Sequence, residues 1–104
     1  MRAQVESHLI PNLHNGNPGM EPIAEKLGVS RQMLYRKLKA EGISFEKLLD
    51  TLRHKMAVHY LNGKKVSVNE TAYLVGFSDP SAFSRAFKRW TGKSPRAHLE
   101  RQMG

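Results

Sequence analysis

The chain of 104 residues contains no cysteine, so it can form neither a disulfide bond nor a thiolate metal site. Such a chain depends on packing alone for its stability, and it suits a reducing compartment. No apolar run approaches the roughly 20 residues that cross a bilayer, and the first ten residues lack a signal-peptide core. The sequence therefore predicts a soluble, cytoplasmic protein without a membrane span.

Acidic residues are scarce as well. Only 9 Asp and Glu oppose 17 Lys and Arg, which leaves a net charge of +8. This excess favours a polyanionic partner, with nucleic acid ahead of an anionic membrane surface. A chain of this length has little core to spare for an enclosed catalytic pocket. The five histidines include no i,i+4 pair that would favour zinc, and no phosphate-binding glycine loop is present. We therefore predict no enzyme, no metal and no cofactor.

Period-2 alternation is almost absent, and proline and glycine divide the chain into helix-sized pieces. The fold class is predicted to be all-α with about seven helices, at about 4–10, 22–27, 30–41, 44–62, 67–75, 79–91 and from 94 onward. Pro11 is expected to stop the first helix and Pro22 to open the second. Apolar residues of the longest helix form one arc (Phe45, Leu48, Leu49, Leu52 and Met56) and a second arc (Ala57 and Leu61). Two arcs predict two packing partners.

A pattern recurs when the chain is shifted by about 48 residues. The spacing Ala-x3-Gly-x-Ser occurs at 24–30 and again at 72–78, with one extra residue after Ser78. Alanine allows a second helix to cross closely, glycine tolerates a positive φ in the turn, and serine caps the next helix. Two such copies, each followed by a basic helix, predict a duplicated helix-turn-helix. A duplicated hairpin that serves only as scaffold is the alternative.

Each of the two following helices has an apolar and a polar side at 100° per residue. In the later copy the apolar side holds Phe83, Ala86, Phe87 and Trp90, and the polar side holds Ser81, Ser84, Arg85, Lys88 and Arg89. In the earlier copy Leu34 and Leu38 lie opposite Gln32, Tyr35, Arg36 and Lys39. We therefore place the later aromatic residues, and Phe77, in a core rather than on a base-stacking surface. Tyr35 is the exception among the aromatic residues, because it lies on the polar side of its helix with Gln32, Arg36 and Lys39.

Nine of the 17 cations lie at 31–40 and 81–96, and these two stretches contain no acid. Uniform charge at repeated positions favours contact with phosphates. Arg36 and Arg85 suit guanine, and Gln32 suits adenine. The predicted phosphate contacts are Arg31, Lys39, Ser84, Lys88, Arg89 and Lys93, together with Ser30 and Ser78, which we expect to be helix caps first. Asp79 is expected to cap a helix rather than to read cytosine.

The segment "AYLVGFSDPSAFSRAFKRWTGKSP", preceded by Arg53-x3-Ala57-x3-Leu61, resembles the C-terminal DNA-binding domain of AraC/XylS-type bacterial transcription regulators. The segment "AEKLGVSRQMLYRKLKAEGISFEKLLDTLR" is similar to the first helix-turn-helix and linker of that family. The resemblance implies a first subdomain at 1–43 with a recognition helix at about 30–41, a linker helix at 44–62, and a second subdomain at 63–104 with a recognition helix at about 79–91.

The resemblance also implies sequence-specific binding of double-stranded DNA, with both recognition helices in successive major-groove turns. A 19-residue linker of about 28 Å is near the ~34 Å of one DNA turn. Base contacts would come from Gln32, Tyr35 and Arg36 in one half-box, and from Pro80, Ser81, Ala82 and Arg85 in the other. RNA polymerase is a further expected partner, and an effector or dimerisation domain is expected N-terminal to this chain.

Two other functions remain open at this point. A binder of single-stranded DNA or RNA would use Tyr35 and the basic grooves, and it would prefer a single strand to any duplex. A basic protein-interaction module would leave DNA binding unaffected by Arg85→Ala.

Overall fold

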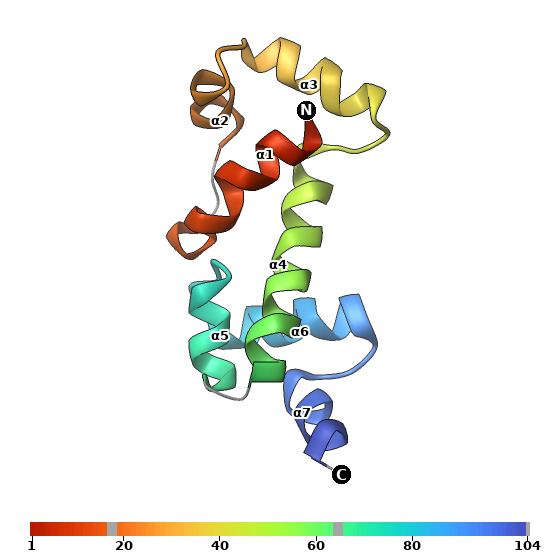
Figure 1. Ribbon diagram of the computed structural model, residues 1–104. Helices are drawn as coiled ribbons and strands as arrows, with labels where there is room; N and C mark the ends of the chain where they lie inside the picture. Colours follow the sequence, from red (N-terminus) through yellow and green to blue (C-terminus); the bar gives the residue numbers. More distant parts are fainter. Residues whose placement is uncertain (17–18, 64–65, 104) are drawn as a thin grey trace. The chain divides into compact units, whose positions relative to one another are not determined.

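The computed structural model describes residues 1–16, 19–63 and 66–103. Over these residues the chain is all-α, with seven α-helices, one short 3-10 helix and no strand (Figure 1). The elements are α1 (Arg2–Leu9), η1 (Ile10–Asn15), α2 (Met20–Lys26), α3 (Arg31–Ala40), α4 (Phe45–Gly63), α5 (Val68–Leu74), α6 (Pro80–Thr91) and α7 (Pro95–Met103). The predicted fold class is confirmed.

One proline agrees with the expectation and one differs from it. Helix α1 ends at Leu9, two residues before Pro11, which then lies in the first turn of the 3-10 helix η1. Helix α2 begins at Met20, two residues before Pro22. The first four N–H groups of a helix have no intrahelical acceptor, so a proline in the third helical position removes no hydrogen bond. Pro22 is therefore inside the helix instead of opening it.

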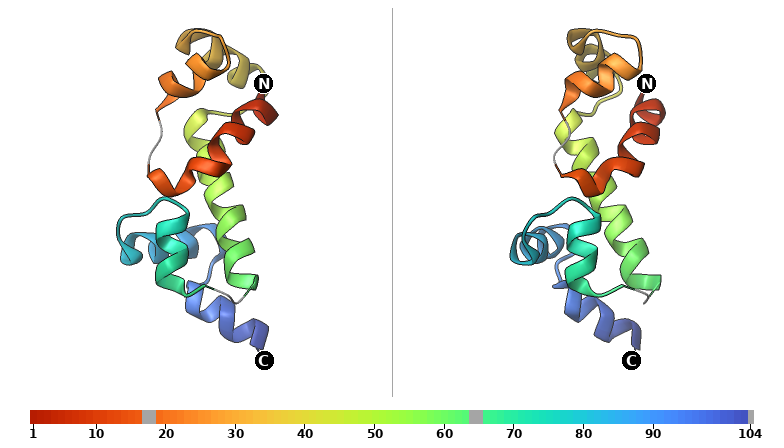
Figure 2. Two further views of the ribbon diagram at one scale, coloured as in Figure 1. Left: turned by 60° about the vertical axis from the view of Figure 1, so that its left-hand side comes forward. Right: turned by 90° about the vertical axis from the view of Figure 1, so that its left-hand side faces the viewer.

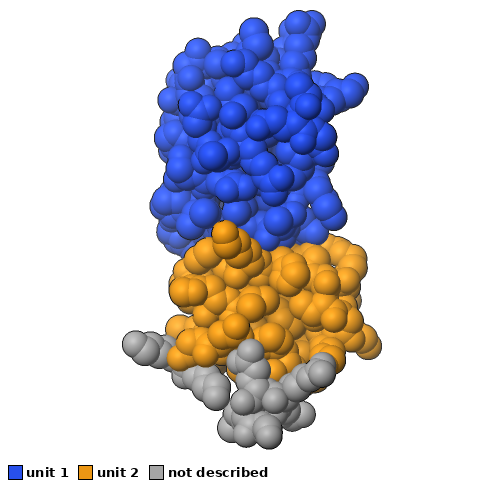
Figure 3. Space-filling view, turned by 45° about the vertical axis from the view of Figure 1, so that its right-hand side comes forward, with its two compact units in different colours: residues 1–52 blue, residues 53–104 orange. Residues whose placement is uncertain are grey.

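The chain divides into two compact units, Met1–Leu52 and Arg53–Gly104 (Figure 3). Within the first unit α2 contacts both α1 and α3, and within the second α6 contacts both α5 and α7 (Figure 2). The division falls inside α4, so this helix supplies buried residues to both units. Phe45, Leu48, Leu49 and Leu52 belong to the first, and Ala57 and Leu61 to the second.

The two apolar arcs predicted for the longest helix are thereby explained, with one correction. Met56, which the wheel groups with the first arc, packs against the buried cluster that contains Ala57 and Leu61. A single turn of helix separates Leu52 from Met56, and the unit boundary lies between them. The wheel alone groups residues by angle and carries no information on where along the helix a partner ends.

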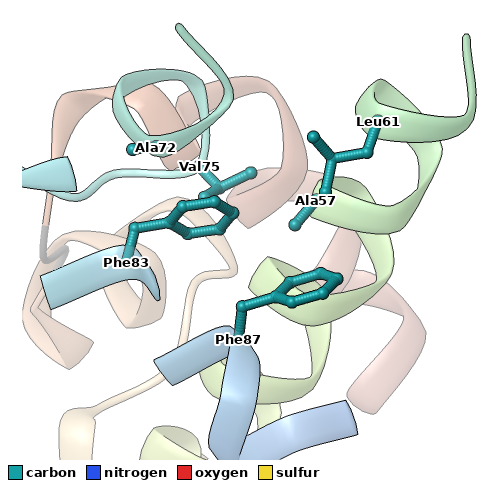
Figure 4. Packing of buried hydrophobic residues seen from close by; sticks show 6 residues of the cluster. All are labelled: Ala57, Leu61, Ala72, Val75, Phe83 and Phe87. Carbon is teal, nitrogen blue, oxygen red and sulfur yellow. The ribbon is translucent and has the colours of Figure 1, made fainter. Parts of the chain in front are cut away.

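The core of the second unit is aromatic. Its buried cluster contains Ala57, Leu61, Ala72, Val75, Phe83 and Phe87 (Figure 4). The ring centroids of Phe83 and Phe87 are 5.8 Å apart, and those of Phe77 and Phe83 are 5.6 Å apart, both tilted. These are favourable separations for aromatic pairs. Phe77 and Trp90 are partly buried against the cluster, so the predicted core role of these aromatic residues is confirmed.

The core of the first unit is mostly aliphatic. Besides the four residues of α4, it buries Val5, Leu9, Leu13, Ile23, Ala24, Leu34 and Leu38. Phe45 is its one buried aromatic ring among the described residues. Leu34 and Leu38 hold α3 by one side and leave the other side of that helix in solvent.

Candidate nucleic-acid interface

The turn between α2 and α3 is a glycine-terminated helix end. Gly28 has a φ of 72°, a conformation that costs a residue with a Cβ more than it costs glycine. The N–H of Val29 donates to the carbonyl of Ala24 at 3.0 Å, and the N–H of Gly28 donates to that of Glu25 at 3.1 Å. This pair of bonds is the Schellman motif, which satisfies carbonyls at the end of a helix.

The turn between α5 and α6 repeats this arrangement atom for atom. Gly76 has a φ of 98°. The N–H of Phe77 donates to the carbonyl of Ala72 at 2.9 Å, and the N–H of Gly76 donates to that of Tyr73 at 3.1 Å. The sequence repeat is therefore a repeat of backbone hydrogen bonding.

The two copies begin their second helices with different caps. The Ser30 hydroxyl accepts the N–H of Met33 at 3.0 Å at the start of α3, as predicted. At α6 the cap is Asp79, whose carboxylate accepts the N–H of Ser81 at 3.0 Å. The prediction that Ser78 is a cap is wrong, because the extra residue of this copy moves the capping position one residue onward. Ser78 is exposed.

The outer side of α3 is polar and cationic. Its exposed residues include Arg31, Gln32, Tyr35, Arg36 and Lys39, all of which the sequence predicted as contacts. Tyr35 is 53% exposed, and the Lys39 ammonium lies 5.9 Å from the centroid of its ring. A cation at this distance is attracted to the face of the ring. The ring is thus restrained on the wet side of the helix.

The outer side of α6, and Lys93 just after it, are exposed or half-buried. Ser81, Arg85, Lys88 and Arg89 are exposed, and Pro80, Ala82, Ser84 and Lys93 are half-buried. Phe83, Ala86 and Phe87 are buried on the opposite side. The segregation of rings from cations that the sequence predicted for this helix is confirmed.

Glu41, the acidic residue directly after α3, interacts with the start of α1. The carboxylate of Glu41 accepts the backbone N–H of Arg2 at 3.1 Å, at the start of α1. The positive end of a helix dipole favours a carboxylate there. Glu6 forms an ion pair with the Arg2 side chain, with 3.1 Å between Nε and Oε1. These two acids therefore interact with α1 and its side chains rather than with the cations of α3.

No cluster of three or more metal-ligating side chains occurs in the part of the chain that the structure describes. None of its helices, over the same residues, is long and apolar enough to cross a membrane.

The structure groups the predicted base contacts by helix. Gln32, Tyr35 and Arg36 share the exposed side of α3, and the other four belong to the first two turns of α6. None of the predicted base or phosphate contacts is buried. Their contacts with a ligand stay predictions.

Two methionines, Met20 and Met33, lie beside the predicted contacts Gln32 and Tyr35, and the sequence did not predict them as part of this surface. Met33 is 43% exposed on α3, next to Gln32. Met20 lies at the start of α2 and lines the surface beside Tyr35. Nothing in the sequence pointed to Met20, because it lies outside α3 and α6.

Together, the repeated turns and the two exposed basic helices define a double helix-turn-helix module. A family model described as a helix-turn-helix domain matches residues 23–101. The chain belongs to this family, which is of the AraC type, so the resemblance noted from the sequence is confirmed.

Known proteins support the same assignment. The chain is 39% identical over 83 residues to the ornithine utilization regulator of Pseudomonas aeruginosa. The aligned residues make up 80% of this chain and 24% of that protein. A DNA-binding transcriptional dual regulator from Escherichia coli K-12 superposes with a TM-score of 0.90 at 26% identity, covering 96% of this chain and 89% of that one. The DNA-binding domain of AdpA, a global transcriptional factor solved in complex with a target DNA, gives 0.81 at 29% identity, covering 95% and 89%.

Proposed function

We propose that this chain is the DNA-binding part of a transcription regulator and that it binds double-stranded DNA in a sequence-specific way. The observation that carries the proposal is the duplicated helix-turn-helix, in which each second helix exposes a cationic side. A helix of this kind enters the major groove with its exposed side toward the base edges. The proteins that this chain resembles include regulators, and one similar domain is known in complex with DNA.

The proposed site is asymmetric. The four outward positions of α3 hold Gln32, Tyr35, Arg36 and Lys39, and the equivalent positions of α6 hold Ser81, Ser84, Arg85 and Lys88. Both sets share an arginine, which suits guanine, and a lysine, which suits a phosphate. They differ at the two positions that precede the arginine. A monomer that places α3 and α6 in successive major-groove turns would read two unlike half-boxes over roughly 17 to 20 base pairs.

The remaining roles follow from the family. We propose no catalytic activity, a cytoplasmic location and RNA polymerase as a further partner. The chain spans 24% of the length of the ornithine utilization regulator. An effector or dimerisation domain is accordingly proposed for the full-length regulator, outside the 104 residues.

A binder of single strands is the alternative that one observation favours. The exposed Tyr35 ring, at 53% exposure, offers a surface on which an unpaired base could stack. A single ring is a small platform. Tyr73 is also exposed, but it lies on α5, and the rings of α6 pack in or against the core of the second unit. The duplex reading therefore explains more of the surface.

Selection of bound sequences from a random duplex pool tests the proposal. We expect two conserved half-boxes about one helical turn apart. With about six to ten phosphate contacts, the affinity for the selected duplex should fall roughly 10³- to 10⁵-fold between 50 and 200 mM salt. The separated strands of the same duplex are the matched competitors. A pool without a consensus, combined with a shallow salt dependence, would refute the proposal.

A further inference from the structure

A shallow hollow lies beside the exposed side of α3. Met20, Arg31, Gln32 and Tyr35 line it, and its volume is about 390 Å³. Three of these residues belong to α3, and Met20 is the first residue of the preceding helix α2. The hollow is therefore built by both helices of the first helix-turn-helix and lies within one compact unit.

Met20 and Tyr35 also line a neighbouring hollow of about 280 Å³. Leu38, Ile43 and Phe45 are among its other lining residues. The two depressions therefore share the Met20 and Tyr35 side chains, and a cation borders each of them, Arg31 the first and Lys39 the second. The ring is also restrained by the Lys39 ammonium, which lies 5.9 Å from its centroid.

Apolar surface among cations is of little use to phosphate binding. The thioether of Met20 and the ring of Tyr35 cannot form strong hydrogen bonds through those surfaces, and the aliphatic stem of Arg31 adds further apolar surface. The arrangement suits a partner that presents a small apolar group amid polar ones. In the major groove of DNA that group is the C5 methyl of thymine.

We propose that this hollow receives the C5 methyl group of a thymine in the first half-box, and that Met20 and Tyr35 form its walls. The inference rests on the proposed function, because it requires α3 in the major groove of a duplex. It makes Met20 a specificity-determining residue that comes from outside the recognition helix.

Gln32 strengthens the choice of thymine. Its side chain lines the same hollow, and a glutamine amide pairs with the N6 and N7 atoms of adenine. Adenine and thymine are partners in one base pair. The Gln32 amide would therefore contact the adenine of an A·T pair, and the apolar hollow beside it would contact the thymine methyl. Residues 31–40 contain no acid that would repel the flanking phosphates, and Glu21, which follows Met20 on α2, is absent from the lining of the hollow.

The experiment changes the DNA first and the protein second. Each thymine of the selected duplex is replaced in turn by deoxyuridine, which lacks only the methyl group, and the dissociation constant is measured with the full chain. At one thymine of the first half-box we expect about a three- to fourfold loss of affinity, the value of one buried methyl group. This arm needs no protein variant, so misfolding cannot imitate the result.

The second arm assigns the effect to the hollow. In Met20→Ala and in Tyr35→Ala, the ratio of affinities for the thymine and deoxyuridine duplexes should fall to about one at that position. Met33→Ala is the matched control, because Met33 is an exposed methionine on α3, the helix of Tyr35, and is absent from the lining of the hollow. It should keep the ratio of the unsubstituted chain.

The outcomes separate this inference from the proposed function. A clear consensus with no deoxyuridine effect in the first half-box overturns the methyl site and leaves duplex binding intact. A deoxyuridine effect that persists in both Met20→Ala and Tyr35→Ala overturns its assignment to the hollow. Tighter binding to the separated strand, lost in Tyr35→Ala, would overturn both proposals in favour of base stacking.

Discussion

The two helix-turn-helix copies have the same turn but differ in their buried core residues and in their exposed residues. In both, an alanine carbonyl accepts the N–H of the residue after the turn glycine, at 3.0 Å in one and 2.9 Å in the other. Beneath the second helix, however, the first copy buries Leu34 and Leu38, whereas the second buries Phe83 and Phe87. The comparison teaches that the backbone of the turn is what a helix-turn-helix requires, and that core and outer face vary around it.

Substitutions in the two cores should lower the free energy of unfolding more than any other change considered for the two copies. Phe87 is fully buried, and its ring lies 5.8 Å from Phe83 and 5.5 Å from His98, centroid to centroid. We expect Phe87→Ala to lower the free energy of unfolding by about 3–5 kcal/mol. For Leu38→Ala we expect about 2–5 kcal/mol and less than for Phe87→Ala, because lost ring pairs add to the lost area. Urea unfolding measures both.

Lys88→Ala is the control for this pair. Lys88 is exposed on the same helix as Phe87, and surface substitutions usually change stability by less than about 0.5 kcal/mol. A loss at Leu38 equal to or above that at Phe87 would show that the aromatic core adds nothing to the second unit.

The outer faces should differ in what they read rather than in how tightly they bind. Arg36 and Arg85 occupy equivalent exposed positions on α3 and α6. Replacing either by alanine should cost about 1–3 kcal/mol of binding free energy and relax the preference at one half-box only. Repeating the duplex selection with each variant measures this.

Arg96→Ala is the matched control, since Arg96 is an exposed arginine of α7, outside both recognition helices. It should leave both half-boxes unchanged. If Arg36→Ala and Arg85→Ala instead weaken all sequences equally, both arginines contact phosphates and the assignment of base contacts is wrong.

The difference between the copies also explains what the sequence could predict. The repeated Ala-x3-Gly-x-Ser spacing predicted both turns, because only a few residue types satisfy a close crossing and a positive φ. The segregation of rings from cations on α6 was predictable because helical periodicity alone decides it. Both predictions rest on local geometry.

The errors arose where local geometry is insufficient. The wheel groups Met56 with Leu52, yet Met56 packs against the cluster of the second unit, since a helical wheel does not locate the boundary between Leu52 and Arg53. The sequence predicts caps at both Ser78 and Asp79, because serine and aspartate both suit this role, and only Asp79 accepts an N–H of α6. Met20 was missed because its neighbour Tyr35 is 15 positions away in the sequence and on another helix.

The turn glycines should show an intermediate effect. Gly28 and Gly76 have φ values of 72° and 98°, and a left-handed conformation costs other residues roughly 1–2 kcal/mol. Gly28→Ala should lose this amount through the backbone alone, because an added Cβ at Gly28 meets no atom within 4 Å. Gly28→Asn should lose less, because asparagine tolerates this region better.

Gly63→Ala is the control for the glycines. An added Cβ at Gly63 also meets no atom within 4 Å, and Gly63 has no positive φ, so the unfolding free energy should stay level or rise slightly. A loss at Gly63 similar to that at Gly28 would show that the helix-turn-helix glycines are not set apart by their backbone conformation.

The caps should give the smallest effect and the finest comparison. Ser30 and Asp79 each accept one N–H at 3.0 Å from the first turn of a recognition helix. Replacing either by alanine should cost about 1 kcal/mol of unfolding free energy, and Asp79→Asn should restore most of the loss at α6. Ser78→Ala should stay within about 0.5 kcal/mol, since Ser78 is exposed and precedes the cap. If Ser78→Ala cost more than Asp79→Ala, the capping position would not have moved with the inserted residue, and the two copies would begin their recognition helices alike.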